Sequence, residues 1–287
     1  MKLFAKKQKK EKEPRYILSP LGTELNNYRV YYMSIWEKLL TFFAALVIGG
    51  FCGLVFYGNQ FLDSTGYPTG ATKIGNMVIF VSIGLLAGFY SLPTRAESLK
   101  KKRQQELALQ FRSLLEALAV SLSSGMNMSD SLQAAYKDLR MEYTDKADIV
   151  GEVEEMILGI QNNIEIEEMI LSLGERSENA DIKNFATVFS VSYRAGGNIK
   201  DIVRRTGNII SEKIEINGEI ETALSSNKVQ FKAMMVIPVV MMLMLRGMSS
   251  DFAASFSTLP GILATTVAII LFGIAYVIGQ KIMDIKG

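Results

Sequence analysis

The chain contains no histidine and a single cysteine, Cys52, which lies inside an apolar run. Zinc sites, Cys/His nucleophile pairs and disulfides all need more of these residues, so the chain cannot assemble any of them within itself. It also has no G-x-x-x-x-G-K-[ST] loop, no G-x-G-x-x-G after a strand and no G-x-S-x-G elbow. We therefore expect that the chain is not an enzyme and that it has no catalytic, cofactor-binding or metal-ligating residue.

An excess of one charge is also missing, because 31 Lys and Arg residues face 29 Asp and Glu residues, a net charge of +2. We therefore expect no nucleic-acid partner. Hydrophobic residues make up 49% of the chain and charged residues 21%. This mixture is typical of a membrane protein that also carries a sizeable polar domain.

Four apolar stretches come close to the length of about 20 residues that a membrane-spanning helix needs. They are residues 39–57, 75–92, 233–245 with their flanks, and 262–279. The third is short and contains Pro238, but spanning helices tolerate proline. The four stretches predict two membrane hairpins.

Lysine and arginine near the spans predict the orientation, because they are enriched on the cytoplasmic side. They gather in residues 1–15, at Arg95 and residues 100–103, and at Lys281 and Lys286, whereas loops 58–74 and 247–261 hold only Lys73. Arg246 lies at a membrane edge. Both termini are then cytoplasmic, with the loops near Asn59 and Ser250 outside, and the basic tail is not a cleaved signal peptide. The predicted organisation is a basic tail (1–38), a first transmembrane hairpin (39–92), a cytoplasmic helical domain (93–232), a second hairpin (233–280) and a short carboxyl end (281–287).

Proline is absent from residue 94 to residue 237, and apolar residues recur at helical spacing between them, as at Phe111, Leu114, Leu115, Leu118 and Leu122. We predict six helices: 97–124, 128–140, 146–160, 164–178, 180–195 and a long one from 199. The fold class is thus all-α, with two transmembrane hairpins flanking a cytoplasmic bundle of about six helices.

One turn motif occurs twice. In "SYRAGGNIKDIVRR" a glycine pair can end one helix in the left-handed conformation, which we place at Gly197, and Asn198 can cap the next helix. The structural turn residues are Gly196, Gly197, Asn198 and Asp201 in this copy and Gly125, Asn127 and Asp130 in "SSGMNMSDSLQAA". A degenerate copy, "GIQNNIEIEEMI", lies between them, so duplication of a helical sub-bundle is possible but not established.

These segments resemble a known family. "FRSLLEALAVSLSSGMNMSDSLQAA", "SYRAGGNIKDIVRR" and "EIETALSSNKVQFKAMMVIPVVMMLML" are together similar to the type II secretion system F domain, over about residues 105–245. The single-copy, four-span arrangement resembles the TadB-like proteins of tight-adherence (Flp) pilus assembly, with the TadC-like paralogue as the alternative. The resemblance implies an inner-membrane platform for a pilus or secretion machine. It also implies a hexameric assembly ATPase, prepilins or pseudopilins, and a paralogous platform subunit or homo-oligomer as partners.

Small residues and proline mark candidate helix packing in the spans. The candidates are Gly49, Gly53, Gly84, Gly88 and Pro238. The glycines form two G-x-x-x-G patterns, which permit close backbone approach. They can join the first two spans to each other or one span to another subunit.

Acidic residues predominate from Glu142 to Glu178, and two interpretations of them stay open. They can form a solvated helix face, or a docking surface for a basic partner. As the docking hypothesis, the ATPase binds a face bearing Glu152, Glu155, Glu165 and Glu168. The basic block 100–103 and the amino-terminal tail are expected to meet anionic membrane lipids.

The sequence thus favours a non-enzymatic platform in the inner membrane that couples an ATPase to pilin movement. A transporter or channel subunit is the alternative, and it is disfavoured because the spans hold no interior charge of the kind that marks an ion path. A signalling receptor is the third possibility, but no external ligand domain is present.

Overall fold

The structure is a computed structural model that describes residues 13–59, 69–248, 255–256 and 258–283. Within these ranges it is 81% helical and has eight helices, four of them long and apolar enough to cross a membrane, so the predicted all-α membrane fold is confirmed. The basic segment 1–12, Ser250 and Lys286 lie outside the described residues.

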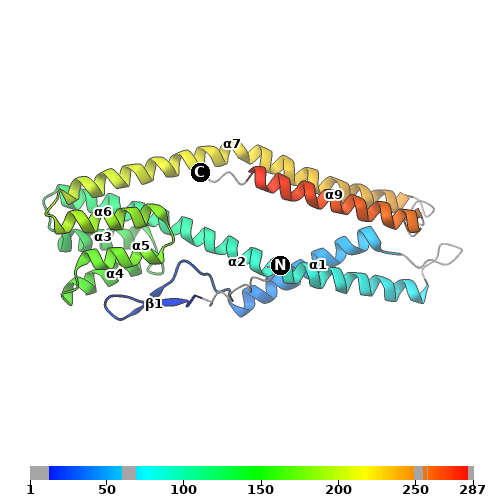
Figure 1. Cartoon of the computed structure of the whole chain (residues 1–287), viewed down its shortest axis with the longest axis horizontal. Helices are drawn as coiled ribbons and strands as arrows, with labels where there is room; N and C mark the ends of the chain where they lie inside the picture. The colour runs from blue at the N-terminus through cyan, green and yellow to red at the C-terminus, as the bar shows by residue number, and fades with distance from the viewer. Residues whose placement is uncertain (1–12, 60–68, 249–254, 257, 284–287) are drawn as a thin grey trace, which may run out of the picture. The chain divides into compact units, whose positions relative to one another are not determined.

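The elements follow one another along the chain as shown in Figure 1. They are β1 (Tyr16–Leu18), β2 (Glu24–Asn26), α1 (Ile35–Tyr57), α2 (Gly70–Ser123), α3 (Met128–Glu142), α4 (Asp148–Gln161), α5 (Ile166–Arg176), α6 (Ala180–Arg194), α7 (Ile199–Met248) and α9 (Leu259–Met283). The predicted helices between residues 128 and 195 correspond to α3 through α6. The predicted helix 97–124 is the second part of α2, which continues through Pro93, and α7 continues through Pro238.

The chain forms two compact units. Unit 1 contains residues 13–32 and 96–215 of the described chain, and unit 2 contains the described parts of residues 33–95 and 216–287. Helices α2 and α7 therefore each contribute to both units.

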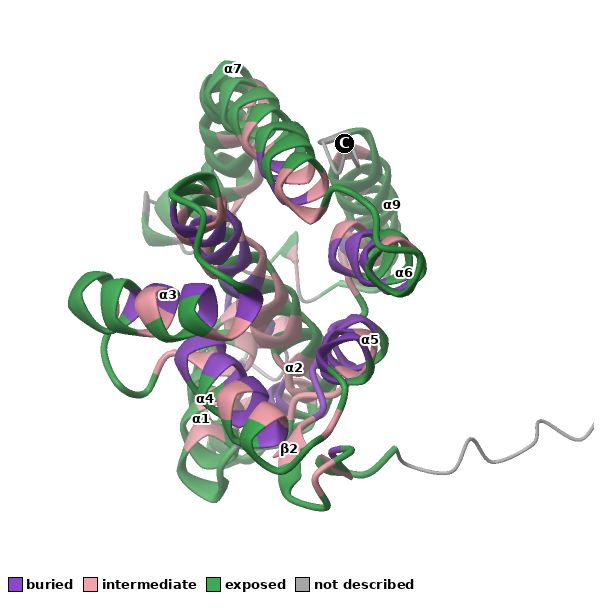
Figure 2. Cartoon of the chain, turned by 90° about the vertical axis from the view of Figure 1, so that its left-hand side faces the viewer, coloured by how far each residue is buried: buried purple, intermediate pink, exposed green. Residues whose placement is uncertain are grey.

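Unit 1 is a helical bundle with one continuous apolar core. The second part of α2 and helices α3 through α7 all place apolar residues in it, because each helix is amphipathic. The largest fully buried side chains include Leu107, Phe111, Leu115, Leu132, Leu139, Ile149, Leu173, Ile182 and Phe189. Figure 2 shows buried positions, in purple, on α3, α4, α5 and α6.

A short β-hairpin was not predicted from the sequence. Strands β1 and β2 pair antiparallel, with Tyr16 opposite Asn26 and Leu18 opposite Glu24. Residues 13–32, which contain this hairpin and are called the strap below, belong to unit 1. Part of the segment 1–38, predicted as a basic tail, is therefore an element of the helical domain.

Unit 2 holds the four apolar helical segments. The side chains of α1 and of the first part of α2 meet across closely spaced glycines, and α7 meets α9 where Phe231 stacks on Tyr276 at 6.0 Å between ring centroids. Tyr57 of α1 and Thr266 of α9 share a hydrogen bond of 3.0 Å between their hydroxyl oxygens.

Candidate functional site

A buried ion pair joins α4 to α5. Arg176 donates two hydrogen bonds to Glu152, from Nη1 to Oε1 at 2.7 Å and from Nη2 to Oε2 at 2.6 Å. Their side chains are only 3% and 4% exposed. Such a bidentate pair is strong, but each charge in it depends on the other because neither can be solvated.

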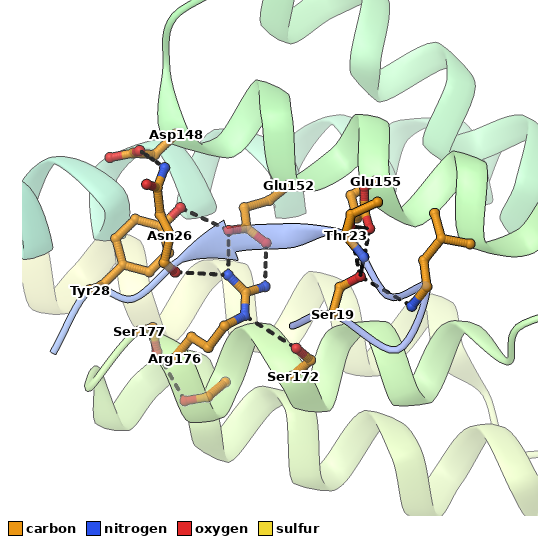
Figure 3. A network of polar contacts seen from close by, with 12 residues as sticks. Ser19, Thr23, Asn26, Tyr28, Asp148, Glu152, Glu155, Ser172, Arg176 and Ser177 are labelled. Carbon is orange, nitrogen blue, oxygen red and sulfur yellow. Dashed lines mark hydrogen bonds and ion pairs between the residues drawn. The ribbon is translucent and has the colours of Figure 1, made fainter. Parts of the chain in front are cut away.

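The strap completes this pair. Tyr28 donates its hydroxyl proton to Glu152 Oε1 at 2.8 Å, and Arg176 donates from Nη1 to the carbonyl oxygen of Asn26 at 3.1 Å (Figure 3). Arg176 Nε also donates to Ser172 Oγ at 3.2 Å. The strap therefore supplies hydrogen-bond partners that the two helices alone would lack.

The pKa values of this cluster follow from burial and charge. Burial, together with the negative charge of Glu152, raises the pKa of Tyr28 well above its usual value. Burial lowers the pKa of Arg176, but the hydrogen bonds and charge of Glu152 outweigh it, so this pKa is raised. Tyr28 is thus neutral and Arg176 charged at any physiological pH.

A second buried carboxylate holds the turn of the strap. Ser19 donates from Oγ to Glu155 Oε1 at 2.7 Å, and Thr23 donates its hydroxyl proton to the same oxygen (Figure 3). Because Ser19 and Thr23 lie on either side of the hairpin turn, one helix side chain fixes the conformation of that turn.

Backbone contacts extend the attachment. The amide of Tyr28 donates to the carbonyl oxygen of Arg176 at 3.1 Å, and Gln104 Nε2 donates to the carbonyl oxygen of Tyr28 at 3.0 Å. The guanidinium of Arg103 lies 4.9 Å from the ring centroid of Tyr28, which favours a cation–π contact. Tyr28 is therefore held by α2, α4 and α5 together.

This network corrects the predicted docking face. Glu152 and Glu155 are 4% and 7% exposed, so neither can contact a partner on the surface. The sequence interpretation was wrong for them because they lie on the side of α4 that faces the strap and α5. Glu165 and Glu168 are exposed, and Glu165 lies 3.5 Å from Arg194.

The basic block 100–103 also differs from its prediction. Lys100 pairs with Glu178 at 2.7 Å and Arg103 pairs with Asp148 at 2.5 Å. These two cations are thus neutralised within unit 1, and Lys101 and Lys102 are the exposed members of the block.

The repeated turns have the same backbone pattern. Gly125 has φ 86°, Met126 N donates to Ser121 O and Gly125 N donates to Leu122 O. The second turn repeats this arrangement at Gly196, which has φ 68°. Both are Schellman motifs, in which the residue after the helix is left-handed. The left-handed residue of the pair is therefore Gly196, and the placement at Gly197 was wrong; a Cβ at Gly197 would lie 3.1 Å from the carbonyl oxygen of Ser192.

The caps and the degenerate turn complete this comparison. Asn127 Oδ1 accepts from the amide of Asp130 at 2.9 Å, and Asn198 Oδ1 accepts from the amide of Asp201 at 3.3 Å. The degenerate copy uses Asn163, with φ 61°, in the same bonding pattern but without a side-chain cap at Glu165.

The glycines of the spans lie where α1 and α2 approach each other. A Cβ at Gly84 would lie 2.7 Å from the carbonyl oxygen of Leu46, and one at Gly53 would lie 2.8 Å from Ile83 Cδ1. Gly49 and Gly88 face Ala87 and Phe42 in the same way. Gly50, which the sequence interpretation did not single out, faces the ring of Phe80, and Pro238 is exposed on α7.

With this geometry established, the chain was compared with known proteins. Residues 114–246 match the family model of type II secretion system (T2SS), protein F. The match supports the T2SS F family and extends from the α2 part of unit 1 through Pro238 in α7. Searches of curated proteins and of solved structures found no match.

The T2SS F family has a known general role. Its members are generally membrane platforms of type II secretion and type IV pilus machinery, structural proteins and not enzymes, which work with a secretion ATPase and pilins. The four apolar helices and the T2SS F match together indicate a multi-pass inner-membrane protein.

Proposed function

We propose that this chain is a non-enzymatic platform protein of a Tad (Flp) pilus or type II secretion machine, which couples a cytoplasmic assembly ATPase to the movement of pilins or pseudopilins. The observation that carries the proposal is the T2SS F match across the helical bundle and into an apolar helix. A TadB-like subunit is the form that we propose, because one copy of the helical domain is flanked by four apolar helices.

Chain continuity supplies a mechanical path for this coupling. Unit 1 continues into apolar helices at three places: the strap precedes α1, and α2 and α7 run on as unbroken helices. Only Met33 and Ser34 separate the strap from α1, and Ser34 caps α1, with Glu37 accepting from the Ser34 amide at 2.8 Å. A displacement of unit 1 is therefore expected to act on α1, α2 and α7 through the backbone.

The buried network gives the strap a role in this mechanism. Without this network, residues 13–32 would be a flexible linker, and a movement of unit 1 would not be transmitted through them. The bonds of Glu152, Glu155 and Arg176 hold the strap to α4 and α5 instead. We therefore propose that the strap transmits force to α1.

The orientation proposed with this function places both termini and unit 1 in the cytoplasm. In a Cys52→Ala background, single cysteines at Asn59 and Ser250 should react with a membrane-impermeant maleimide in intact cells. A cysteine at Lys146, which is exposed in unit 1, should react only after lysis. Labelling of the Lys146 variant in intact cells would show that the orientation is the opposite of the proposed one.

The partners are tested by purification from native membranes followed by mass spectrometry. The platform proposal expects a secretion ATPase and pilin-like proteins among the copurified partners, lost when unit 1 is deleted. If a solute-transport protein copurifies in their place, the result would favour the alternative function of a transporter or channel subunit.

A further inference from the structure

The strap and α5 enclose a groove that the platform proposal does not use. Its volume is about 450 Å³, and its apolar lining comes from Ile17, Leu18, Pro20 and Leu171. Leu18 is 67% exposed, although it lies on a strand paired with β2. Ser19, Ser172 and Arg176, which also line the groove, can be found in Figure 3.

Two carboxylates border this groove on α5. Glu168 and Glu175 are exposed, and within the described part of the chain neither side chain makes an ion pair or hydrogen bond. Seven residues correspond to two helical turns, so the two residues share a helix face about 10 Å apart along the axis. A bound segment can therefore meet one carboxylate at each end of the apolar lining.

The groove is lined by two cations, Arg29 and Arg176. Arg176 is paired with buried Glu152. Arg29 is exposed and donates from Nε to the carbonyl oxygen of Glu175 at 2.9 Å, and within the described residues it makes no ion pair. Two unpaired carboxylates, Glu168 and Glu175, therefore face one unpaired cation, Arg29, and the net charge at the border is negative.

We propose that this groove docks a segment of the assembly ATPase that carries one or two apolar side chains between Lys or Arg residues about 10 Å apart. The proposal rests on the proposed platform function and names the surface for its ATPase partner. Pockets that hold small ligands have volumes of roughly 300–1,000 Å³, so this groove accepts a few side chains and not a whole helix. Apolar side chains fit Leu18 and Leu171, and cations fit Glu168 and Glu175.

The position of the groove explains why docking here would matter. Its two walls are the strap and α5, which the hydrogen bond from Arg176 Nη1 to the carbonyl oxygen of Asn26 connects. A segment bound between them contacts both the helical bundle and the element that precedes α1. Force from the ATPase then reaches α1 through the strap.

The test uses the full chain in phosphatidylcholine nanodiscs and the secretion ATPase copurified with it. The variant Glu168→Lys/Glu175→Lys should bind the ATPase about tenfold more weakly, because two exposed attractive pairs become repulsive. The control, Asp138→Lys/Glu154→Lys, makes the same charge change at two exposed acids outside the groove and should bind like the wild type. Leu18→Ser should weaken binding without any charge change.

A photocrosslinking amino acid identifies the occupant directly. Placed at Leu18, it should crosslink to the ATPase, whereas the same group at Met141, which is 82% exposed on α3, should not. A crosslink from Leu18 to lipid, to residues 1–12 or to a second copy of the chain overturns the proposal, as does wild-type affinity of the Glu168→Lys/Glu175→Lys variant. If the ATPase still binds the wild type in those cases, only the groove proposal fails and the proposed platform function is retained. If the wild type binds no ATPase, both proposals fail.

Discussion

Unit 1 buries its large apolar side chains, whereas unit 2 exposes them. Phe111 and Phe189 are each 1% exposed in unit 1, while Trp36 and Leu86 of unit 2 are 80% and 72% exposed. Unit 2 keeps small residues such as Gly84 for its inner contacts. The reversal is typical of a chain with one unit surrounded by water and the other by lipid.

The two units also obtain a specific packing by different means. Unit 1 contains a buried network of charged and polar groups around Glu152 and Arg176. The α1–α2 contact in unit 2 depends on the shape of glycine surfaces, because lipid already solvates apolar side chains and provides no hydrophobic driving force between helices. Substitutions should therefore damage the two units by different mechanisms.

The largest effect is expected from Arg176→Met. It leaves the carboxylate of Glu152 buried without its cation, which should cost unit 1 about 3–5 kcal/mol. Hydrogen–deuterium exchange of the full chain should accelerate in α4, α5 and the strap but not in α1 or α9. The double variant Glu152→Leu/Arg176→Met should recover much of the loss, and equal exchange in the single and double variants would contradict this explanation.

Overpacking of the α1–α2 contact should come next. In Gly84→Leu the added Cβ would lie 2.7 Å from the carbonyl oxygen of Leu46, and a backbone atom cannot rotate away. We expect a loss of about 1–3 kcal/mol, seen as a lower unfolding temperature in detergent. Gly273→Leu is the matched control, because a Cβ at Gly273 has no neighbour within 4 Å. Equal melting of the two variants would show that the α1–α2 contact does not depend on close approach.

A substitution that strains the backbone of the repeated turn should have a smaller effect. Gly196→Val places a β-branched residue at φ 68°, which should cost about 1–2 kcal/mol. Exchange should accelerate at the end of α6 and the start of α7. The control is Gly151→Val, in a helical position with no atom within 4 Å of the added Cβ. If the two substitutions behave alike, the turn does not require a left-handed residue.

The smallest effect should come from Tyr28→Phe, which removes one hydrogen bond to Glu152 and should cost about 1 kcal/mol at neutral pH. Because the folded-state pKa of Tyr28 lies above its unfolded value of about 10, its contribution is complete below pH 10 and is lost as the pH rises further. Urea unfolding between pH 8 and pH 11 should show the stability difference between wild type and variant shrinking above pH 10. A constant difference would show that the pKa of Tyr28 is the same in the folded and the unfolded chain.

Much of unit 1 could be predicted from the sequence, because its helices are short, amphipathic and separated by recognisable turns. The predicted helix 128–140 corresponds to α3 and the predicted helix 180–195 to α6. The strap could not be predicted, since β1 and β2 have three residues each and show no clear alternation. Nor could the ion pair, because charged residues are usually exposed and 24 positions separate Glu152 from Arg176.

By itself, the sequence determined what depends on neighbouring residues: which segments are helical, where turns with glycine and asparagine interrupt them, and which stretches are apolar enough to enter a membrane. Only the tertiary structure decided which carboxylates are buried, which glycine of the pair is left-handed and where the strap binds. The physical reason is that burial and hydrogen bonding are settled between residues far apart in the chain. A glutamate is solvated by water on an exposed helix face, but it is buried and hydrogen-bonded to protein groups where the strap covers it.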